Sequence, residues 1–332
     1  MLIAVDAMGG DHAPEEICKG AIKACSEYED LELALVGIPE AILPHVDNSG
    51  LVGRKLHIIP AEEVIGMDEA PALSIRKRKN SSLHVAMQMV KSKEACGCVS
   101  AGNTGAIVAG GVLIVGRIKG IDRPGLGVPL PALNRVTMLI DVGATVRCKP
   151  INLYQFALMG DVYMRTIQGV AEPSVALLSN GEEEIKGDEL IQEARKLIKN
   201  APVNFVGNVE GHDIPIGNAD VVVCEGFTGN VLLKFIEGTG SAIYSLFKEE
   251  LEKRFWSKVG MTFMIPMLKD LWVRFNYERT GGTPLLGVNG AVIKAHGRSK
   301  SEAVKSAIGV ARNFVIKKGV EKIVEELSEG GI

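Results

Sequence analysis

The sequence predicts an α/β fold of three layers (α/β/α), with a mostly parallel sheet between two layers of helices. Short runs rich in β-branched residues alternate with helical patterns, which is typical of parallel strands joined by crossover helices. Several of these runs are apolar without alternation, as expected for strands buried on both faces. No low-complexity linker divides the 332 residues, of which 46% are hydrophobic, so a single domain over residues 1–332 is expected.

The individual elements follow from the same patterns. Strands are expected at residues 2–6, 31–37, 55–60, 95–100, 136–142, 174–179, 203–207 and 219–224. Helices are expected at residues 14–27, 80–92, 103–118, 152–168, 187–200 and 229–253. The closing helix has the clearest pattern, because Ser299 and Glu302 form a predicted capping box before an apolar stripe. The stripe consists of Val304, Ala307, Ile308, Ala311 and Val315.

Residues 246–277 depart from this alternation and contain no strand pattern. Two helical patterns flank the sequence VGMTFMIPM at residues 259–267, which predicts a helical hairpin inserted in the domain and protruding from the sheet. Basic and aromatic residues flank an apolar cluster that a protein surface rarely leaves bare. We expect the base of the hairpin to form a homodimer interface and its tip to touch an anionic membrane surface transiently. The tip residues are Met261, Phe263, Met264 and Ile265.

Bulk properties exclude several classes of protein. The net charge of −3 favours neither nucleic acid nor a membrane as a partner of the whole molecule. Six cysteines occur without a Cys-x-x-Cys motif, so a reducing, cytoplasmic setting is expected, with peripheral contact at the cytoplasmic membrane through the hairpin. The first residues lack the basic start of a signal peptide, and no apolar stretch is long enough to span a bilayer.

The motif Gly-x-Thr-Gly occurs twice, each time where a predicted strand gives way to a predicted helix. We call residues 102–105 the first turn and residues 226–229 the second turn. A helix N-terminus offers unpaired N–H groups and partial positive charge, and glycine lets a ligand approach the backbone, so the motif suits an oxyanion such as phosphate. The two turns would hold one phosphate from two sides, or a phosphate and a developing oxyanion. The alternative is an ordinary turn in which threonine caps a helix.

Other polar side chains also follow predicted strands, where ligands of open α/β sheets bind. The candidate phosphate- or substrate-binding residues are Asp6, Gly9, Gly10, Asp11, Ser100, Gly102, Asn103, Thr104, Gly105, Asp141, Lys149, Gly226, Thr228, Gly229 and His296. The alternative for each charged side chain is a solvated surface position. No Gly-x-Gly-x-x-Gly follows a strand, no Walker lysine motif occurs, and no residue spacing fits a metal site. The chain is therefore expected to use no cofactor and no metal.

A set of motifs in fixed order resembles one known family. The motifs are AVDAMGGDHAP, SAGNTGA, GIDRP, DVGA, GEEEIKG, GNVEG, EGFTGNVLLK and GTPLLGVNG, and they span the whole chain. They resemble the phosphate acyltransferases of bacterial phospholipid synthesis. The chain departs from the usual family pattern at Thr145, Arg147 and His212.

The resemblance implies a reaction, a fold and partners. Members of the family transfer a fatty acyl group from acyl carrier protein to inorganic phosphate, and a membrane glycerol-phosphate acyltransferase consumes the acyl phosphate. The implied fold is of the isocitrate/isopropylmalate dehydrogenase type, and the implied assembly is a homodimer. Phosphate is itself the nucleophile, so the site needs only to align it with the thioester and to stabilise the tetrahedral oxyanion.

The family motifs also assign candidate roles. We expect Lys186, Asn230 and His12 to be catalytic, with Lys186 offsetting charge in the transition state and Asn230 holding phosphate or the thioester oxygen. The basic run Arg76, Lys77, Arg78 and Lys79 is expected to dock the acidic carrier protein, although such runs are usually just solvated. Three alternatives stay open: a phosphotransacetylase-like enzyme that uses coenzyme A, a dehydrogenase of the same fold, and a non-catalytic scaffold at the membrane surface.

Overall fold

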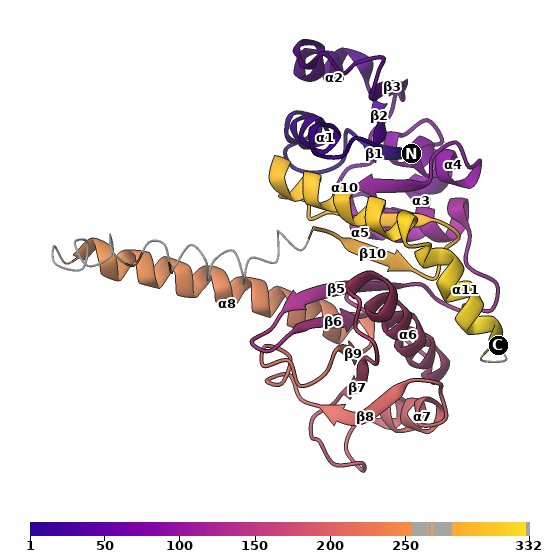
Figure 1. Ribbon diagram of the computed structural model, residues 1–332, viewed down its shortest axis with the longest axis vertical. Coiled ribbons are helices and arrows are strands. Elements are labelled where there is room, and N and C mark those ends of the chain that lie inside the picture. The colour runs from indigo at the N-terminus through magenta and orange to yellow at the C-terminus, as the bar shows by residue number, and fades with distance from the viewer. Residues whose placement is uncertain (254–263, 265–266, 268–280, 330–332) are drawn as a thin grey trace.

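The computed structural model describes residues 1–253, 264, 267 and 281–329 (Figure 1). The strands are β1 (Leu2–Asp6), β2 (Glu32–Gly37), β3 (Leu56–Pro60), β4 (Gly97–Ser100), β5 (Gly125–Pro131), β6 (Val136–Ile140), β7 (Ser174–Leu178), β8 (Asn204–Val209), β9 (Val221–Val223), β10 (Thr283–Leu286) and β11 (Ala291–Lys294). The helices are α1 (Glu15–Glu27), α2 (Pro39–Val46), α3 (Pro71–Lys77), α4 (Ser82–Lys91), α5 (Thr104–Gly110), α6 (Pro150–Tyr163), α7 (Glu189–Ile198), α8 (Gly226–Lys253), α10 (Ser301–Ile316) and α11 (Gly319–Glu329).

Within the described residues, the strands form one sheet in the order β3-β2-β1-β4-β11-β10-β5-β6-β9-β7-β8. Strands β3, β2, β1, β4 and β11 are mutually parallel and form what we call the N-block. Strands β6, β9, β7 and β8 are also mutually parallel and form the C-block. Antiparallel pairs link β11 to β10, β10 to β5 and β5 to β6, so the two blocks run in opposite directions. The predicted mostly parallel α/β sheet is confirmed, and a mixed-direction seam joins its halves.

The sequence reasoning missed the strands of that seam. Strand β5 contains Pro129 and Pro131, and proline lowers the expectation of a strand because it donates no ladder hydrogen bond. Strands β10 and β11 have four residues each, too few to show a period of two. The helices α2, α3 and α11 were also missed, and α2 carries Pro44 in its interior.

Helices cover both faces of the sheet. On one face, a single core cluster joins strands of both blocks to α3, α4 and α5, with side chains of α8 packed against it. On the other face, α1, α2 and α10 cover the N-block, while α6, α7 and α11 cover the C-block. Alternation in β1 shows the layering, because Ile3 and Val5 face one core cluster and Ala4 faces the other. The predicted three-layer arrangement is confirmed.

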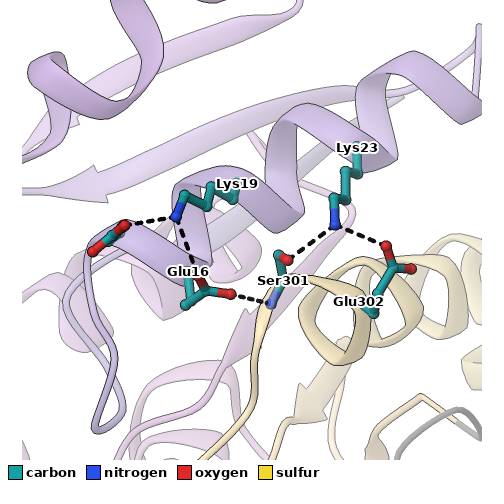
Figure 2. A network of polar contacts seen from close by, with 6 residues as sticks. Glu16, Lys19, Lys23, Ser301 and Glu302 are labelled. Atoms are coloured by element: carbon teal, nitrogen blue, oxygen red, sulfur yellow. Dashed lines mark hydrogen bonds and ion pairs between the residues drawn. The ribbon is translucent and has the colours of Figure 1, made fainter.

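Helix α10 confirms most of its predicted stripe but not its predicted cap. Val304, Ala307, Ile308 and Ala311 are buried. The capping box is wrong, because the helix begins at Ser301 and the side chain of Glu302 pairs with Lys23 (Figure 2). The Ser301 N–H instead donates to Glu16 of α1, at 2.7 Å. The carboxylate of Glu16, far away in the sequence, thus accepts an N–H group at the start of α10. Local sequence spacing does not reveal such a cap.

Helix α8 projects away from the sheet (Figure 1). Its 28 residues span about 42 Å at 1.5 Å per residue. It contains residues 246–253, where the predicted hairpin begins. Most of the remainder, including Met261, Phe263 and Ile265, lies outside the described residues, so the hairpin stays a prediction. Met264 is helical and its exposed fraction is 44%. Among the described residues, no helix is both long and apolar enough to cross a membrane.

Candidate active site

A buried carboxylate organises the carboxyl ends of β1 and β4. The Ser100 hydroxyl donates to Asp6 at 2.7 Å, and the Gly102 N–H donates to the Ser100 hydroxyl oxygen at 3.1 Å. Burial raises the pKa of Asp6, although hydrogen bonds from Ser100 and Ser82 oppose the shift. A Cβ atom at Gly9 would lie 2.5 Å from the Asp6 carboxylate, so only glycine fits there. Asp6 therefore shapes the loops on which Gly9 and Gly102 lie.

The first turn begins helix α5 and is held by its own asparagine. The Asn103 side-chain oxygen accepts from the Ala106 N–H at 3.1 Å and caps the helix. Its amide nitrogen donates to the carbonyl groups of Gly66, Met67 and Glu69. Both ends of the Asn103 side chain are thus bonded to the chain itself. Thr104 and Gly105 are the first two residues of α5.

The loop after β11 lies beside the loop after β1. The Asp11 N–H donates to the Gly297 carbonyl at 2.8 Å, and a Cβ atom at Gly10 would lie 3.1 Å from the same oxygen. His296, one residue earlier, places Nε2 4.0 Å from the Glu237 carboxylate of α8. His12 is exposed and lines an open hollow on the surface. The other side chains of that hollow belong to Asp11, Ala13, Pro14, Glu15, Glu16, His45 and Lys300.

A second buried carboxylate organises the carboxyl end of β6. The Asp141 carboxylate accepts four backbone N–H groups, from Leu126, Gly143, Ala144 and Thr145, at 2.6–3.1 Å. Burial raises its pKa to about 6, and the four donors oppose that shift. Like Asp6, this carboxylate holds a loop in shape.

The second turn packs directly on this loop. The Gly226 N–H donates to the Thr145 carbonyl at 3.0 Å. A Cβ atom at Gly229 would collide with the Asp141 carbonyl oxygen, so the close approach of α8 requires glycine. Asn230 is exposed, and its Cβ would lie 3.6 Å from a Cβ atom at Gly143. The glycines of this turn thus have a packing reason besides any ligand.

Glu225 occupies the donors at the start of α8. Its carboxylate accepts the Phe227 N–H at 2.5 Å and the Thr228 N–H at 2.9 Å, and the Thr228 hydroxyl donates to it as well. In this structure, the N–H groups of the second turn therefore bind the carboxylate of the chain's own Glu225. A phosphate that used the same donors would have to displace Glu225, a residue that the sequence reasoning overlooked.

The two candidate lysines lie on other loops of the C-block. Lys186 is half-buried in the loop between β7 and α7, and its N–H donates to the Glu183 carbonyl at 3.0 Å. The Asn208 amide nitrogen donates to the Gly181 and Glu183 carbonyl groups, so β8 holds this loop. Lys149 immediately precedes α6, and its N–H donates to the Asn152 side chain at 2.8 Å.

Helix α8 connects the two halves of the candidate site. Its first turn contacts the Asp141 loop, and about 14 Å further along the helix Glu237 reaches His296 of the N-block. A small cavity beside Glu237, to which Lys294 contributes, was not foreseen from the sequence. Within the described part of the chain, no cluster of three or more His, Cys, Asp or Glu side chains is placed to hold a metal.

Replacing Asp141 with asparagine is expected to lower the free energy of unfolding by about 1–3 kcal/mol, because an amide NH₂ would face backbone N–H donors. The pKa of Asp141 rises from 3.8 to about 6 on folding, so the native state binds the proton more tightly. The wild-type stability should therefore fall as pH rises between these values, and this contribution should vanish in Asp141→Asn. Urea unfolding across this pH range measures both effects.

The matched control is Glu189→Gln, because Glu189 is an exposed carboxylate at the start of α7. It should keep the wild-type dependence of stability on pH. Identical pH profiles for Asp141→Asn and the wild type would contradict the role given to the buried carboxylate.

Comparison with known structures supports the fold. A phosphotransacetylase from Streptococcus pyogenes aligns with a TM-score of 0.66 and 17% identity, over 95% of this chain and 94% of that one. The EutD phosphotransacetylase from Staphylococcus aureus aligns with a TM-score of 0.61 and 14% identity, with the same coverage. At this level of identity, the likeness concerns the fold.

Comparison of sequences identifies the family. A family model described as a fatty acid synthesis protein matches residues 1–322. A phosphate acyltransferase from Heliobacterium modesticaldum is 48% identical over 328 residues, which cover 98% of each chain. A phosphate acyltransferase from Caldanaerobacter subterraneus subsp. tengcongensis is 46% identical, over 100% of this chain and 98% of that one. The chain therefore belongs to the phosphate acyltransferase family, and like its relatives it is an acyltransferase.

Proposed function

We propose that this protein transfers a fatty acyl group from acyl carrier protein to inorganic phosphate and releases acyl phosphate for phospholipid synthesis. The observation that carries the proposal is the full-length match to phosphate acyltransferases, combined with polar loops at the carboxyl ends of strands in both blocks. The name of these relatives, phosphate acyltransferase, supports phosphate as the second substrate. The partners are acyl carrier protein and phosphate, and a membrane glycerol-phosphate acyltransferase is linked only through the product.

The proposed reaction forms one bond and breaks one bond. A phosphate oxygen attacks the thioester carbon, the carbonyl becomes a tetrahedral oxyanion, and the carrier-protein thiolate leaves and takes up a proton. Alignment of phosphate and stabilisation of the oxyanion suffice for this step. We assign these two roles to Lys186, to Asn230 and to the N–H groups of the second turn, from which the substrate would displace Glu225. We give His12 a catalytic role at the rim of the N-block, where it is exposed to an incoming substrate.

The donor is tested by comparing acyl carrier protein with coenzyme A. Purified enzyme should release thiol from long-chain acyl carrier protein only when phosphate is present. Its kcat/KM with the carrier-protein donor should exceed that with the matching acyl-coenzyme A. Equal or greater efficiency with acyl-coenzyme A would favour the phosphotransacetylase-like alternative.

We propose the region around α3 as the docking surface for the carrier protein. Arg76, Lys77 and Lys79 are exposed, and Leu73 beside them has an exposed fraction of 52%. Arg78 differs, because it pairs with Glu69 at 3.1 Å and donates to the Val64 carbonyl. Arg78 therefore braces the loop that Asn103 holds, while its three neighbours remain available to an acidic partner.

Charge reversal at Arg76 and Lys77 is expected to raise the KM for acyl carrier protein about tenfold and to weaken its dependence on salt, because rim charges mainly steer association. Lys91→Glu, at an exposed lysine that ends α4, is the control and should change neither quantity. Steady-state kinetics over a salt series measures the effect. An unchanged KM throughout the series would rule out this docking surface.

We propose that α8 forms the dimer interface, because a stripe of apolar side chains on it is exposed. The stripe consists of Phe227, Val231, Phe235, Ile243, Leu246 and Phe247, with exposed fractions of 44–67%. At 3.6 residues per turn, Val231, Phe235, Ile243 and Leu246 fall within about 120° of the helix circumference, and Phe227 and Phe247 flank them on either side. A second copy of the helix would cover an apolar surface that a monomer rarely leaves bare.

Aspartate substitutions at Phe263, Met264 and Ile265 are expected to abolish co-sedimentation with anionic vesicles, because the tip would lose its apolar side chains and gain negative charge. The dimer and the turnover without membranes should remain as in the wild type. Sedimentation velocity and a vesicle pull-down measure the two properties. If the variant falls apart into monomers, the tip belongs to the dimer interface and the membrane contact is wrong.

A further inference from the structure

A small cavity lies at the seam between the two blocks. Its volume is about 50 Å³, several times the space that one water molecule needs. Lys294 of β11, Thr283 of β10, Val128 of β5 and Glu237 of α8 line it, together with His296. The cavity thus combines groups from the N-block, from the strands of the seam and from the helix that begins in the C-block.

Lys294 contributes a positive charge to this cavity. It ends β11, in register with Ser100 of β4, and it is half-buried. Burial lowers the pKa of its ammonium group, and Glu237 opposes this shift. Among the described residues, no carboxylate lies within ion-pair distance of the Lys294 ammonium. A partly desolvated ammonium is costly without a close anion, so the cavity favours an anionic ligand.

Glu237 adds a carboxylate to the cavity. Its side chain is largely buried, with an exposed fraction of 18%, and its carboxylate lies 4.0 Å from His296 Nε2. A carboxylate can only accept hydrogen bonds, so it repels an anion that carries no proton. Inorganic phosphate at neutral pH retains a P–OH group that can donate to Glu237, whereas sulfate has none.

We propose that this seam cavity is the inorganic phosphate subsite, in which Lys294 pairs with the oxyanion, the Thr283 hydroxyl donates to it, and Glu237 accepts its P–OH proton. This assignment rests on the proposed acyl transfer to phosphate and adds Lys294, Thr283 and Glu237 to the site. Thr283 stands directly opposite Lys294 in the β10–β11 pair, so both reach one ligand. Glu237 then distinguishes phosphate from sulfate.

The test is titration calorimetry of the full-length protein with phosphate and with sulfate, in the absence of an acyl donor. The wild type should bind phosphate at least tenfold more tightly than sulfate. Lys294→Met should lose at least tenfold in phosphate affinity, and Glu237→Gln should bind sulfate at least tenfold more tightly than the wild type does. Lys248→Gln, at an exposed lysine further along the same helix, is the control and should bind both anions as the wild type does.

Several results would overturn the assignment. It fails if the wild type binds no phosphate, if Lys294→Met keeps wild-type phosphate affinity, or if Glu237→Gln keeps the wild-type preference against sulfate. Should Lys294→Met fail to fold by circular dichroism, Thr283→Val carries the test and must weaken phosphate binding at least threefold. Acyl transfer by the wild type is assayed separately. If the wild type turns over but the variants bind phosphate and sulfate as it does, only the subsite assignment is wrong. If the wild type binds phosphate but does not transfer the acyl group, only the proposed function is wrong.

Discussion

A Gly229→Ala variant is expected to lose at least about a hundredfold in kcat/KM, because a misplacement of about 1 Å at a reacting centre costs this much. The new methyl group would collide with the Asp141 carbonyl oxygen and would lie 2.8 Å from the Cys224 sulfur. Neither can yield easily, since four backbone N–H groups hold the Asp141 loop. The first turn of α8 must therefore move, and with it Asn230. Steady-state kinetics with both substrates measures the loss.

Gly238→Ala is the matched control on the same helix. A Cβ atom at Gly238 would have no heavy atom within 4 Å, so this variant should keep its activity. It should also gain stability, because alanine in a helix is favoured over glycine by up to about 1 kcal/mol. If Gly229→Ala retains full activity, the close packing of the second turn on the Asp141 loop is not needed for catalysis.

A Lys186→Ala variant is expected to lower kcat by about a hundredfold or more, while the KM for phosphate changes little. The reason is that an oxyanion donor acts mainly in the transition state, where charge develops. The loop that carries Lys186 is held to β8 by Asn208, so removing the side chain leaves the backbone in place. Single-turnover measurements with saturating phosphate report the chemical step directly.

Lys199→Ala provides the control for this experiment. Lys199 follows α7, its side chain has an exposed fraction of 69%, and it lies 3.9 Å from Glu184 of the same loop. Its removal alters the local charge as Lys186→Ala does, yet turnover should remain normal. Near-normal turnover in a folded Lys186→Ala protein would refute the role assigned to Lys186.

Much of the fold could be predicted because apolar strands of the two blocks are buried on both faces. Strands such as β1 and β2 read as continuous apolar runs, and each was placed to within one residue at either end. The seam was not predictable, because β5 contains prolines and β10 and β11 are short. The pairing of β10 with β5 is also non-local, so no short window of sequence contains the evidence for that pair.

The sequence predicts which polar residues of the site follow strands. It predicts less well which groups those residues contact. Asn103 and Asp141 are predicted ligands, yet the hydrogen bonds of both side chains are made with backbone groups of the chain itself. Sequence spacing cannot distinguish a ligand from a loop brace, because both require a polar residue after a strand. Lys294 and Glu237 could not be placed together from the sequence for another reason. They line one cavity only because α8 passes from the C-block to the N-block.

Isotope transfer from phosphate tests the central claim most directly. The enzyme is supplied with long-chain acyl carrier protein and with phosphate labelled with oxygen-18 at all positions, and the product is examined by mass spectrometry. Direct attack by phosphate predicts an acyl phosphate that retains all four labelled oxygens, formed in equal amount to the released carrier-protein thiol. Thiol release without phosphate, or a free fatty acid whose new oxygen comes from water, would contradict acyl transfer to phosphate.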